Sequence, residues 1–215
     1  MLVEDMMVKD VHTLKETDPI ERALRLMKEK KIRHIPVVDG EKRVIGIVTD
    51  RDIRSAVPSV FYSREHEEVF QMTVKSIMKR DVITVHPLDF VEDAAVVLFE
   101  NRIGCLPVVK ENRLVGIITQ TDVLEAFIQL VGANQPGSRI EVRVPNRAGM
   151  LHEVAGLIRE HHVNIHSVLV YPDKKGSDDK ILVFRLGTMN PRPIADKIRE
   201  KGFAVLWPVP PEMKS

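Results

Sequence analysis

The chain has almost no cysteine, no excess of charge and no long apolar run, and each absence excludes a class of protein. Its single cysteine, Cys105, cannot form an internal disulfide, which indicates a reducing cytoplasm. Thirty-two basic residues against 31 acidic ones give a net charge of +1. That balance removes the electrostatic reason to expect nucleic acid or an anionic membrane as partner. The longest apolar run, Ala94 to Phe99, is far too short to cross a bilayer. We therefore expect an unexported cytoplasmic protein.

Common catalytic motifs are also missing from the sequence. It contains no serine nucleophile elbow, no Walker lysine loop and no Gly-x-Gly-x-x-Gly. Four histidines resemble a metal cluster, but no cysteine or nearby carboxylate completes a ligand set, so solvated histidines fit better: His152, His161, His162 and His166. Cys105 has no activating base and precedes a core strand, which favours a buried apolar role. We predict no catalytic residue, no metal and no catalytic cofactor.

The sequence does contain an internal repeat. Ile32 to Val38 and Gly46 to Asp52 return later as Ile103 to Val109 and Gly116 to Asp122. Matched residues are 71 positions apart as far as Val38 and Val109, and 70 positions apart from Gly46 and Gly116 onward. A one-residue change fits a turn between two strands, where length is tolerated. Self-similarity over about 55 residues outweighs any short motif.

Each repeat has the pattern of a strand, a helix, two strands and a second helix. Asp18-Pro19 is typical of a helix start, with Asp18 as the N-cap. The expected elements of the first repeat are 11–14, a helix from Asp18, 35–38, 44–48 and 49–56. Those of the second repeat are 82–85, a helix after Asp89, 106–109, 114–118 and a helix from Thr119.

Residues 1 to about 130 resemble the CBS domain family, whose tandem pairs are called Bateman modules. The specific elements are the hydrophobic-Pro-Val-Val strand and the Gly-hydrophobic-x-Thr-x-x-Asp end of the next strand, each present twice. In that family, paired repeats leave two clefts that commonly take adenosine nucleotides. The resemblance implies that Asp52 and Asp122 hold ribose hydroxyls and that Thr49 and Thr119 face phosphate at a helix start. It places further residues on the walls: Thr13, Arg33, His34, Ile35, Arg51, Thr84, Gly104, Cys105 and Leu106.

Elementary chemistry is compatible with this assignment and with a simpler one. A helix start offers unpaired N–H groups to phosphate, and a carboxylate can accept both ribose hydroxyls. Thr-x-x-Asp is also a variant capping box, in which the two residues satisfy each other and bind nothing. The repeats differ in charge, because Gly104, Cys105 and Thr121 replace Arg33, His34 and Arg51. We therefore expect the first cleft to bind AMP or ATP more tightly than the second.

A second domain follows the breaker-rich segment 132–138. Its order of elements is strand, helix, strand, strand, helix, strand, a ferredoxin-like βαββαβ sandwich. Residues 139–207 resemble the ACT domain family, a regulatory module that typically binds amino acids or other small molecules at subunit interfaces. The resemblance implies an effector site at Asn146, Gly149, Met150, Leu151, Asn164 and Ile165. Asn146 stands where the family usually has an acidic residue, so the alternative is a pure dimerisation domain.

Together these observations predict an α/β (α+β) chain made of a Bateman module and a C-terminal ACT-like domain. The expected divisions are repeat 1 (1–60), an inter-repeat segment (61–73), repeat 2 (74–131), a linker (132–138), the ACT-like domain (139–208) and a tail (209–215). We expect a non-catalytic homodimeric sensor of an adenosine nucleotide, with a small metabolite at the ACT domain and an unidentified protein target.

The combination of domains resembles acetoin-utilisation proteins of bacilli. That resemblance implies a role in using acetoin or butanediol as a carbon source, with links to growth and sporulation. Two other classes remain open: a structural oligomerisation scaffold without a ligand, and an enzyme with an unrecognised site.

Overall fold

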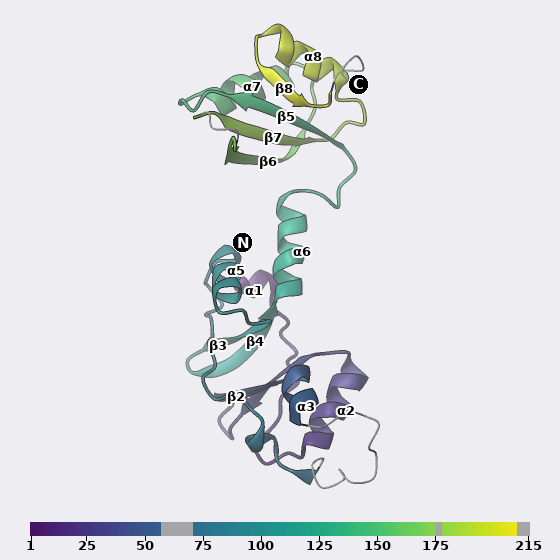
Figure 1. Ribbon diagram of the computed structural model, residues 1–215. Helices are drawn as coiled ribbons and strands as arrows, with labels where there is room; N and C mark the ends of the chain where they lie inside the picture. Colours follow the sequence, from purple (N-terminus) through teal and green to yellow (C-terminus); the bar gives the residue numbers. More distant parts are fainter. Residues whose placement is uncertain (57–70, 175–177, 210–215) are drawn as a thin grey trace. The chain divides into compact units, whose positions relative to one another are not determined.

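The computed structural model describes residues 1–56, 71–174 and 178–209 (Figure 1). The chain divides into two compact units, Met1–Ala126 and Phe127–Ser215. Most of the inter-repeat segment and nearly all of the C-terminal tail lie outside the described residues. Each unit is described by itself below.

The first unit contains the two repeats, and each repeat is built on an antiparallel hairpin flanked by two helices. Repeat 1 contributes α2 (Ile20–Lys30), β1 (His34–Val38), β2 (Val44–Thr49) and α3 (Asp50–Ala56). Repeat 2 contributes α5 (Val91–Glu100), β3 (Cys105–Lys110), β4 (Arg113–Thr119) and α6 (Gln120–Leu130). The expected helices and paired strands are therefore confirmed, and so is the fold class. The expected leading strands are reduced to single bridges, from Leu14 to Val37 and from Val85 to Val108.

The hairpin turns explain why the repeat offset changes by one residue. In repeat 2 the turn residues Glu111 and Asn112 have φ of 50° and 61°, a two-residue turn that follows the twist of its strands. In repeat 1 the loop is one residue longer, and the Asp39 carboxylate accepts from the backbone N–H groups of Glu41 and Arg43, both at 2.9 Å. Both hairpins tolerate the difference because it lies in the turn and leaves the strand register unchanged.

Asp18, the predicted N-cap, does not cap α2, the first helix of repeat 1. The helix begins at Ile20 with Pro19 at the N-cap and no side-chain cap. The Asp18 carboxylate instead accepts from the Lys15 backbone N–H at 2.7 Å and from Arg22 at 2.9 Å. Its backbone carbonyl accepts from the Val74 N–H at 2.7 Å, so this turn serves a contact with a distant segment.

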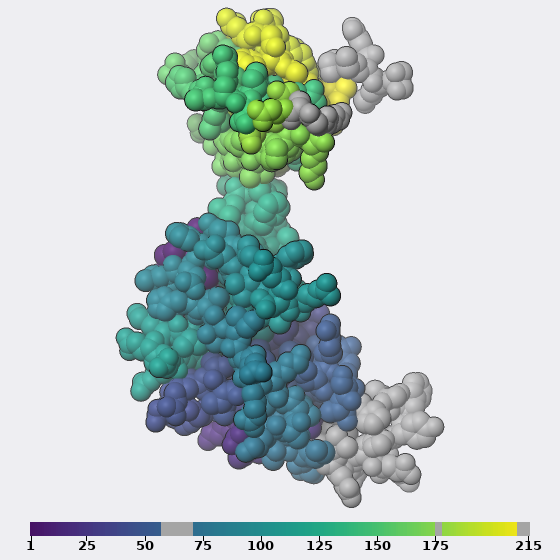
Figure 2. All heavy atoms as spheres, turned by 60° about the vertical axis from the view of Figure 1, so that its left-hand side comes forward, coloured from purple at the N-terminus to yellow at the C-terminus, as the bar shows by residue number. Residues whose placement is uncertain are grey.

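The leading segments of the two repeats are exchanged between the hairpins. Val8, which follows α1 (Val3–Met6), bridges Ile117 of β4 in the other repeat. In the matching place, Lys79 follows the 3₁₀ helix η1 (Val74–Ser76) and bridges Ile47 of β2. Figure 2 shows purple N-terminal atoms beside teal atoms of repeat 2. The exchange ties the repeats into one unit, because each hairpin is bridged by Leu14 or Val85 of its own repeat at one strand and by Val8 or Lys79 of the other repeat's leading segment at the other strand.

Each repeat has its own apolar core. Ile20, Ala23, Met27, Ile35 and Val48 lie in the first, together with Val74 from the exchanged segment. The second core uses the equivalent residues Val91, Ala94, Leu98, Leu106 and Ile118, with Val3 in the place of Val74. Ile47, Cys105 and Ile117 form a small third cluster from β2, β3 and β4, where the repeats meet.

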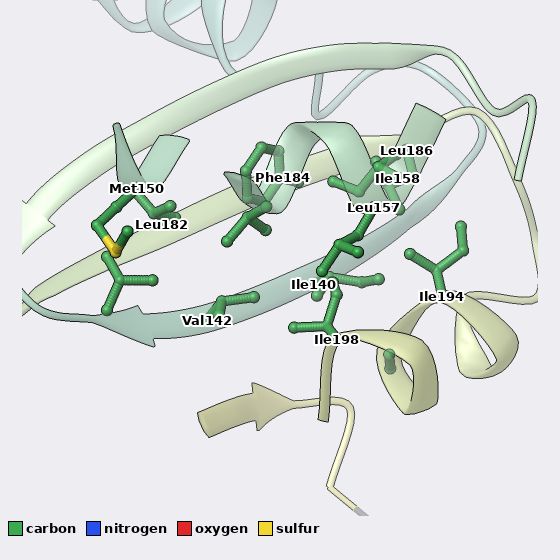
Figure 3. Packing of buried hydrophobic residues seen from close by; sticks show 13 residues of the cluster. Ile140, Val142, Met150, Leu157, Ile158, Leu182, Phe184, Leu186, Ile194 and Ile198 are labelled. Carbon is green, nitrogen blue, oxygen red and sulfur yellow. The ribbon is translucent and has the colours of Figure 1, made fainter. Parts of the chain in front are cut away.

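The second unit is a four-stranded antiparallel sheet covered on one face by two helices. Its elements are β5 (Ser138–Val144), α7 (Met150–Arg159), β6 (Ile165–Pro172), β7 (Lys180–Leu186), α8 (Arg192–Glu200) and β8 (Ala204–Trp207). The strand order is β6-β7-β5-β8, as a βαββαβ sandwich requires. Figure 3 shows inward residues of β5 and β7, such as Ile140 and Phe184, facing Leu157, Ile158 and Ile198 of the helices. Among the described helices, none is long and apolar enough to span a membrane.

Candidate functional site

A cavity of about 1030 Å³ lies between the two repeats of the first unit. Its wall is built from three pairs of equivalent segments. The leading segments contribute Val8 to His12 and Lys79 to Ile83, and the starts of β1 and β3 contribute residues around His34 and Cys105. The ends of β2 and β4, with the first residues of α3 and α6, form the third pair, and the end of α5 adds Leu98, Phe99 and Glu100. Both predicted clefts therefore open into one continuous space.

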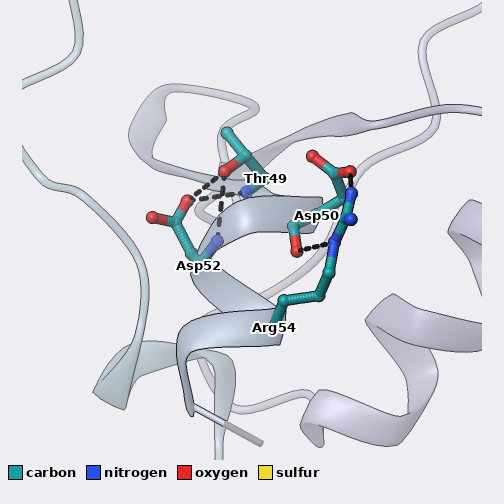
Figure 4. Close-up of polar contacts among 4 residues, drawn as sticks. All are labelled: Thr49, Asp50, Asp52 and Arg54. Carbon is teal, nitrogen blue, oxygen red and sulfur yellow. Dashed lines mark hydrogen bonds and ion pairs between the residues drawn. The ribbon is translucent and has the colours of Figure 1, made fainter. Parts of the chain in front are cut away.

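The Thr-x-x-Asp motif of repeat 1 forms a closed local network (Figure 4). One oxygen of Asp52 accepts from the Thr49 N–H at 2.9 Å and from the Thr49 hydroxyl at 2.6 Å. The Thr49 hydroxyl in turn accepts from the Asp52 N–H at 3.3 Å. This is a capping box. The geometry leaves the second Asp52 oxygen, Oδ1, for a further partner, and the ammonium of Lys79 lies 3.7 Å from it.

The same motif in repeat 2 repeats this geometry without the lysine. Asp122 accepts from the Thr119 N–H and hydroxyl, both at 2.7 Å, and the Asp122 N–H donates to that hydroxyl at 3.4 Å. The residue equivalent to Lys79 is Val8, so no ammonium stands at that place. Asp122 lies on the cavity wall, whereas Asp52 does not.

Several backbone N–H groups at the helix starts already have partners within the protein and are not available to a ligand. The Thr49 N–H is held by Asp52, the Asp52 N–H by Thr49, and the Asp50 N–H donates to the Arg33 carbonyl at 3.0 Å. In repeat 2 the Gln120 N–H donates to the Gly104 carbonyl at 3.1 Å. Recognition of a phosphate at this site consequently depends on side chains more than on helix-start amides.

Basic side chains line the cavity and are unevenly distributed. Arg33, Arg51 and Lys79 gather at the end of β2, whereas Arg102 is the wall's basic residue from the body of repeat 2. A smaller depression of about 400 Å³ continues from Arg33, Asp50 and Arg51 to Arg54 and Ser55. Arg54 forms an ion pair with Asp50. The repeat 1 side therefore presents an arginine-lined surface suited to an anionic group.

The remaining wall is acidic or apolar. Acidic residues balance the cations in number: Asp10, Asp50, Asp81, Glu100 and Asp122 against Lys31, Arg33, Arg51, Lys79 and Arg102. Branched aliphatic side chains from both repeats also line the cavity: Val8, Val11, Ile32, Ile47, Val82, Ile83, Ile103 and Ile117. The wall thus offers aliphatic surface for a planar base, carboxylates for hydroxyl groups and guanidinium groups for phosphate.

His34 and Cys105 occupy equivalent positions and have opposite shifts of pKa. Burial lowers the pKa of His34 below its ordinary 6.5, against an opposing effect of Asp50 and a smaller one of Asp52, while Arg33 adds to the lowering. Burial raises the pKa of the Cys105 thiol to about 12. Both groups are therefore neutral near pH 7, and Cys105 behaves as a small apolar residue.

Several predicted site residues lie outside this wall. Ile35 and Leu106 are fully buried in the two cores, because the strands carry their side chains away from the cavity. Thr13, Thr84 and Asp52 are also absent from the wall, whereas the other predicted residues of the CBS part line it. Sequence reasoning overlooked residues that the exchanged segments bring in, above all Asp10, His12, Lys79 and Asp81. The repeat itself carried no sign of that exchange.

The candidate residues of the second unit are scattered around the start of α7 and of β6. Gly149 has φ of 92° at the N-cap of α7, a conformation that favours glycine, and Met150 is buried in the core. Leu151 and Ile165 are exposed. Asn146 donates to Asp178 at 3.2 Å, and the Asn164 carbonyl accepts from the Gly187 N–H at 2.9 Å.

Two family models match the chain. The CBS domain model matches residues 3–59 and 74–129, and the ACT domain model matches residues 138–203. A curated relative, a CBS domain-containing protein of Dictyostelium discoideum, is 32% identical over 143 residues, which are 64% of this chain and 99% of the relative. The chain also matches homoserine O-acetyltransferase of Methanococcus vannielii, but spans only 24% of that enzyme, at 34% identity over 57% of this chain.

Solved structures agree over the same part of the chain. A Vibrio cholerae protein whose name, AcuB, assigns it to acetoin utilization is 36% identical, with a TM-score of 0.55 over 63% of this chain and 96% of that one. The CBS domain pair of protein MJ0100 was solved with methylthioadenosine and S-adenosyl-L-methionine; it is 29% identical, with a TM-score of 0.53 over 63% and 98%.

CBSX2, a CBS-pair protein of Arabidopsis thaliana, was solved with AMP. In that complex it is 27% identical, with a TM-score of 0.53 over 60% of this chain and 97% of that one. Proteins with such pairs thus hold adenosine ligands in regulatory modules. The chain belongs to the CBS domain family, with a tandem pair of CBS domains followed by an ACT domain.

Proposed function

We propose that this chain is a non-catalytic regulatory protein that binds a phosphorylated adenosine ligand, of the AMP or ATP type, in the cavity between its CBS repeats. The observation that carries the proposal is the composition of the wall beside β2. Arg33, Arg51 and Lys79 stand there within reach of the same cavity that Asp122 and the aliphatic residues line. The adenosine ligands held by MJ0100 and CBSX2 support it.

Each part of such a ligand finds matching chemistry. The adenine ring packs against aliphatic residues such as Ile32 and Ile47, which bury its faces. Ribose hydroxyls donate to a motif carboxylate, which keeps an oxygen beyond its capping bonds. Phosphate oxygens accept from Arg33 and Arg51, whose guanidinium groups match that geometry. Binding of this kind requires no bond to be broken.

Calorimetric titration of adenosine, AMP and ATP tests the proposal. Arg33→Gln should weaken AMP roughly tenfold, since it removes one charge-assisted hydrogen bond, and should leave adenosine almost unchanged. Arg43→Gln is the matched control, because Arg43 is an exposed arginine of the same repeat that pairs with Asp39 on the hairpin turn, outside the cavity. Failure of all three ligands to bind would instead favour a scaffold, and chemical conversion of a bound ligand would favour an enzyme.

The ACT domain is proposed as the second regulatory part of a homodimer. Strand β6 is an edge strand with an exposed apolar side, and such edges pair with a second copy. A small metabolite would bind near Asn146 and Gly149, at the start of α7, where the backbone turns. Light scattering at micromolar concentration should give twice the 24.5 kDa chain mass.

A cellular role in the use of acetoin or butanediol is proposed on the likeness to the Vibrio cholerae protein. In this role the chain reports adenosine nucleotide levels to an unidentified partner of the pathway, with consequences for growth and sporulation. A deletion strain should grow normally on glucose and poorly on acetoin. Restoration by the wild-type chain but not by Arg33→Gln would connect the phenotype to the cavity, and normal growth of the deletion strain on acetoin would contradict the role.

A further inference from the structure

The end of helix α5 reaches the cavity between the repeats, whereas the end of its counterpart α2 does not. Residues 98–100 lie on the wall, but the equivalent residues 27–29 of repeat 1 do not. Both helices are followed by a residue with positive φ, Lys31 at 55° and Arg102 at 52°, so the chain turns in the same way in the two repeats. The side chains therefore distinguish the two helix ends, above all Phe99, the one aromatic residue of α5.

Phe99 leaves its ring uncovered beside the cavity. It is 83% exposed, whereas the neighbouring Leu98 is 2% exposed and packs in the core of repeat 2. Among the described residues of the wall, Phe99 is the only Phe, Tyr or Trp, and its equivalent in repeat 1 is Lys28. An uncovered aromatic ring on a cavity wall is a surface that a flat ligand can bury. Nucleobases stack on such rings, because every base has a π face.

The two ends of the cavity also differ in charge. Between the end of the first helix and the start of the second, the wall of repeat 1 is mainly basic and that of repeat 2 mainly acidic: Lys31, Arg33 and Arg51 with Asp50 in the first, Glu100 and Asp122 with Arg102 in the second. Carboxylates repel a phosphate group and accept hydrogen bonds from ribose hydroxyls. The repeat 2 end is therefore suited to the uncharged part of a nucleotide, its sugar and its base.

The cavity has room for more than one ligand. Pockets that hold a single drug-sized molecule measure about 300 to 1,000 Å³. This cavity measures about 1030 Å³. A nucleotide whose phosphate lies at Arg33 and Arg51 consequently leaves space at the repeat 2 end.

We infer that the repeat 2 end of the cavity is a nucleoside site, in which Phe99 stacks on the base and Asp122 accepts from the ribose hydroxyls. The inference rests on the proposed function and extends it from one class of ligand to two. The phosphate dominates affinity at the repeat 1 end, and the base dominates it at the repeat 2 end. The repeat 2 end does not distinguish AMP from adenosine, because Glu100 and Asp122 offset the cation of Arg102.

Calorimetric titration of the full chain with adenosine, AMP and ribose 5-phosphate tests the inference. The wild type should show a stronger event that AMP and ribose 5-phosphate share, and a weaker one that AMP and adenosine share. Phe99→Leu keeps an apolar side chain but removes the ring, so it should weaken the second event roughly tenfold and leave ribose 5-phosphate unchanged. Phe90→Leu is the matched control, because Phe90 is 52% exposed at the other end of α5 and lies off the wall.

Tryptophan in place of Phe99 gives an independent measurement. Phe99→Trp keeps an aromatic ring, so it should retain the affinity for adenosine, and adenosine should quench its fluorescence. The wild type, titrated in the same way, supplies the background, because its one tryptophan, Trp207, lies in β8 of the ACT domain. Unchanged fluorescence of Phe99→Trp at saturating adenosine would contradict contact between residue 99 and the base.

Three further results would overturn the inference. The first is equal affinity for adenosine in Phe99→Leu and the wild type, and the second is equal weakening by Phe90→Leu. The third is a weakened second event in Phe99→Leu together with a changed mass in light scattering, which would assign the effect to assembly. Failure of adenosine and AMP to bind the wild type would reject the proposed function itself, and this outcome is distinguishable because no variant is needed to observe it.

Discussion

The imidazole of His34 lies directly against the backbone of Gly104. A Cβ placed on Gly104 would stand 2.5 Å from Nε2 of His34 and 2.9 Å from its Cε1. The two residues belong to opposite repeats, and Gly104 is the equivalent of Arg33. A side chain at this position in repeat 2 would occupy the place of the histidine, so the loss of the arginine and the placement of His34 belong together.

Gly104→Ala should displace His34 without unfolding the protein. The atoms that the new methyl group meets are the end of a side chain that can rotate away, so we expect a change in unfolding free energy of less than about 1 kcal/mol. AMP affinity should nevertheless change, because the ring moves within the cavity. His34→Ala provides the control: in that background Gly104→Ala should have little further effect. Additive effects of the two substitutions on affinity would contradict this coupling.

Substitution of the two motif aspartates tests whether the first cleft binds AMP more tightly than the second. Asp52→Ala and Asp122→Ala each remove the same capping bonds, so each should cost a similar 0.5–2 kcal/mol of stability, an order-of-magnitude value. Their effects on AMP should differ, because Lys79 stands beside Asp52 and Val8 in the equivalent place. Asp52 does not line the cavity but positions Lys79, which does, so calorimetry should show that Asp52→Ala weakens the tighter binding event and that Asp122→Ala leaves it. The reverse result would refute the charge argument.

Local sequence patterns predicted the elements well, because hairpins and amphipathic helices are determined by residues close in sequence. The strands that contain Ile35 and Leu106 were predicted from their β-branched runs. Gly149 was predicted in a tight turn, and its φ of 92° is the conformation that such a turn requires. The start of α2 was misplaced because the Asp18 carboxylate accepts from the Lys15 N–H and the Arg22 side chain and from no N–H group at the helix start. Local bonds of the carboxylate thus replaced the capping bond that the sequence pattern predicted.

The cavity wall was harder to predict than the fold. Ile35 begins an apolar run in which every residue of β1 after His34 is buried, so its place in the core could have been expected from the sequence. The presence of Lys79 beside Asp52 was not predictable from the repeat, since sequence similarity does not say which hairpin a short leading segment joins. The pairing of the helix-start amides likewise depends on Arg33 and Gly104 carbonyls that are far from the motifs in sequence.

Cys105 should be almost unreactive in the folded protein. With a pKa of about 12, its thiolate fraction at pH 8 is lower than that of an ordinary thiol by roughly a thousandfold. Iodoacetamide labelling followed by mass spectrometry should therefore be slow in buffer and fast in urea. Labelling of the folded chain at the rate of a free thiol would contradict the burial of this group.

The same shift makes stability fall at alkaline pH. The folded protein keeps the Cys105 proton while the unfolded chain loses it above the ordinary thiol pKa of 9.0. The contribution of the protonated Cys105 thiol to the free energy of unfolding is therefore fully present below pH 9 and is lost as the pH rises towards 12. Cys105→Ala should flatten this part of the stability curve, as measured by urea unfolding at pH 8 and pH 10.

His34 should make stability depend on pH in the acidic range. Its pKa is lower in the folded state than its ordinary 6.5, so the unfolded chain takes up a proton first as the pH falls. The contribution of neutral His34 is fully present above about pH 6.5 and declines below it. His34→Gln should reduce the loss of stability between pH 7 and pH 5.5 in urea unfolding, and an identical loss in both proteins would contradict the shift.

AMP should bind together with a proton on His34. A phosphate near Arg33 and His34 favours the imidazolium form, so it raises a pKa that burial lowers in the free protein. At pH 7, titrations in buffers with different ionisation enthalpies should show proton uptake by the wild type and less uptake by His34→Gln. Adenosine is the ligand control, because without phosphate it should produce no such uptake. Because AMP itself takes up a proton near pH 6, the difference between the two proteins, rather than the wild-type value, identifies the group; equal uptake by both would exclude His34 as the proton acceptor.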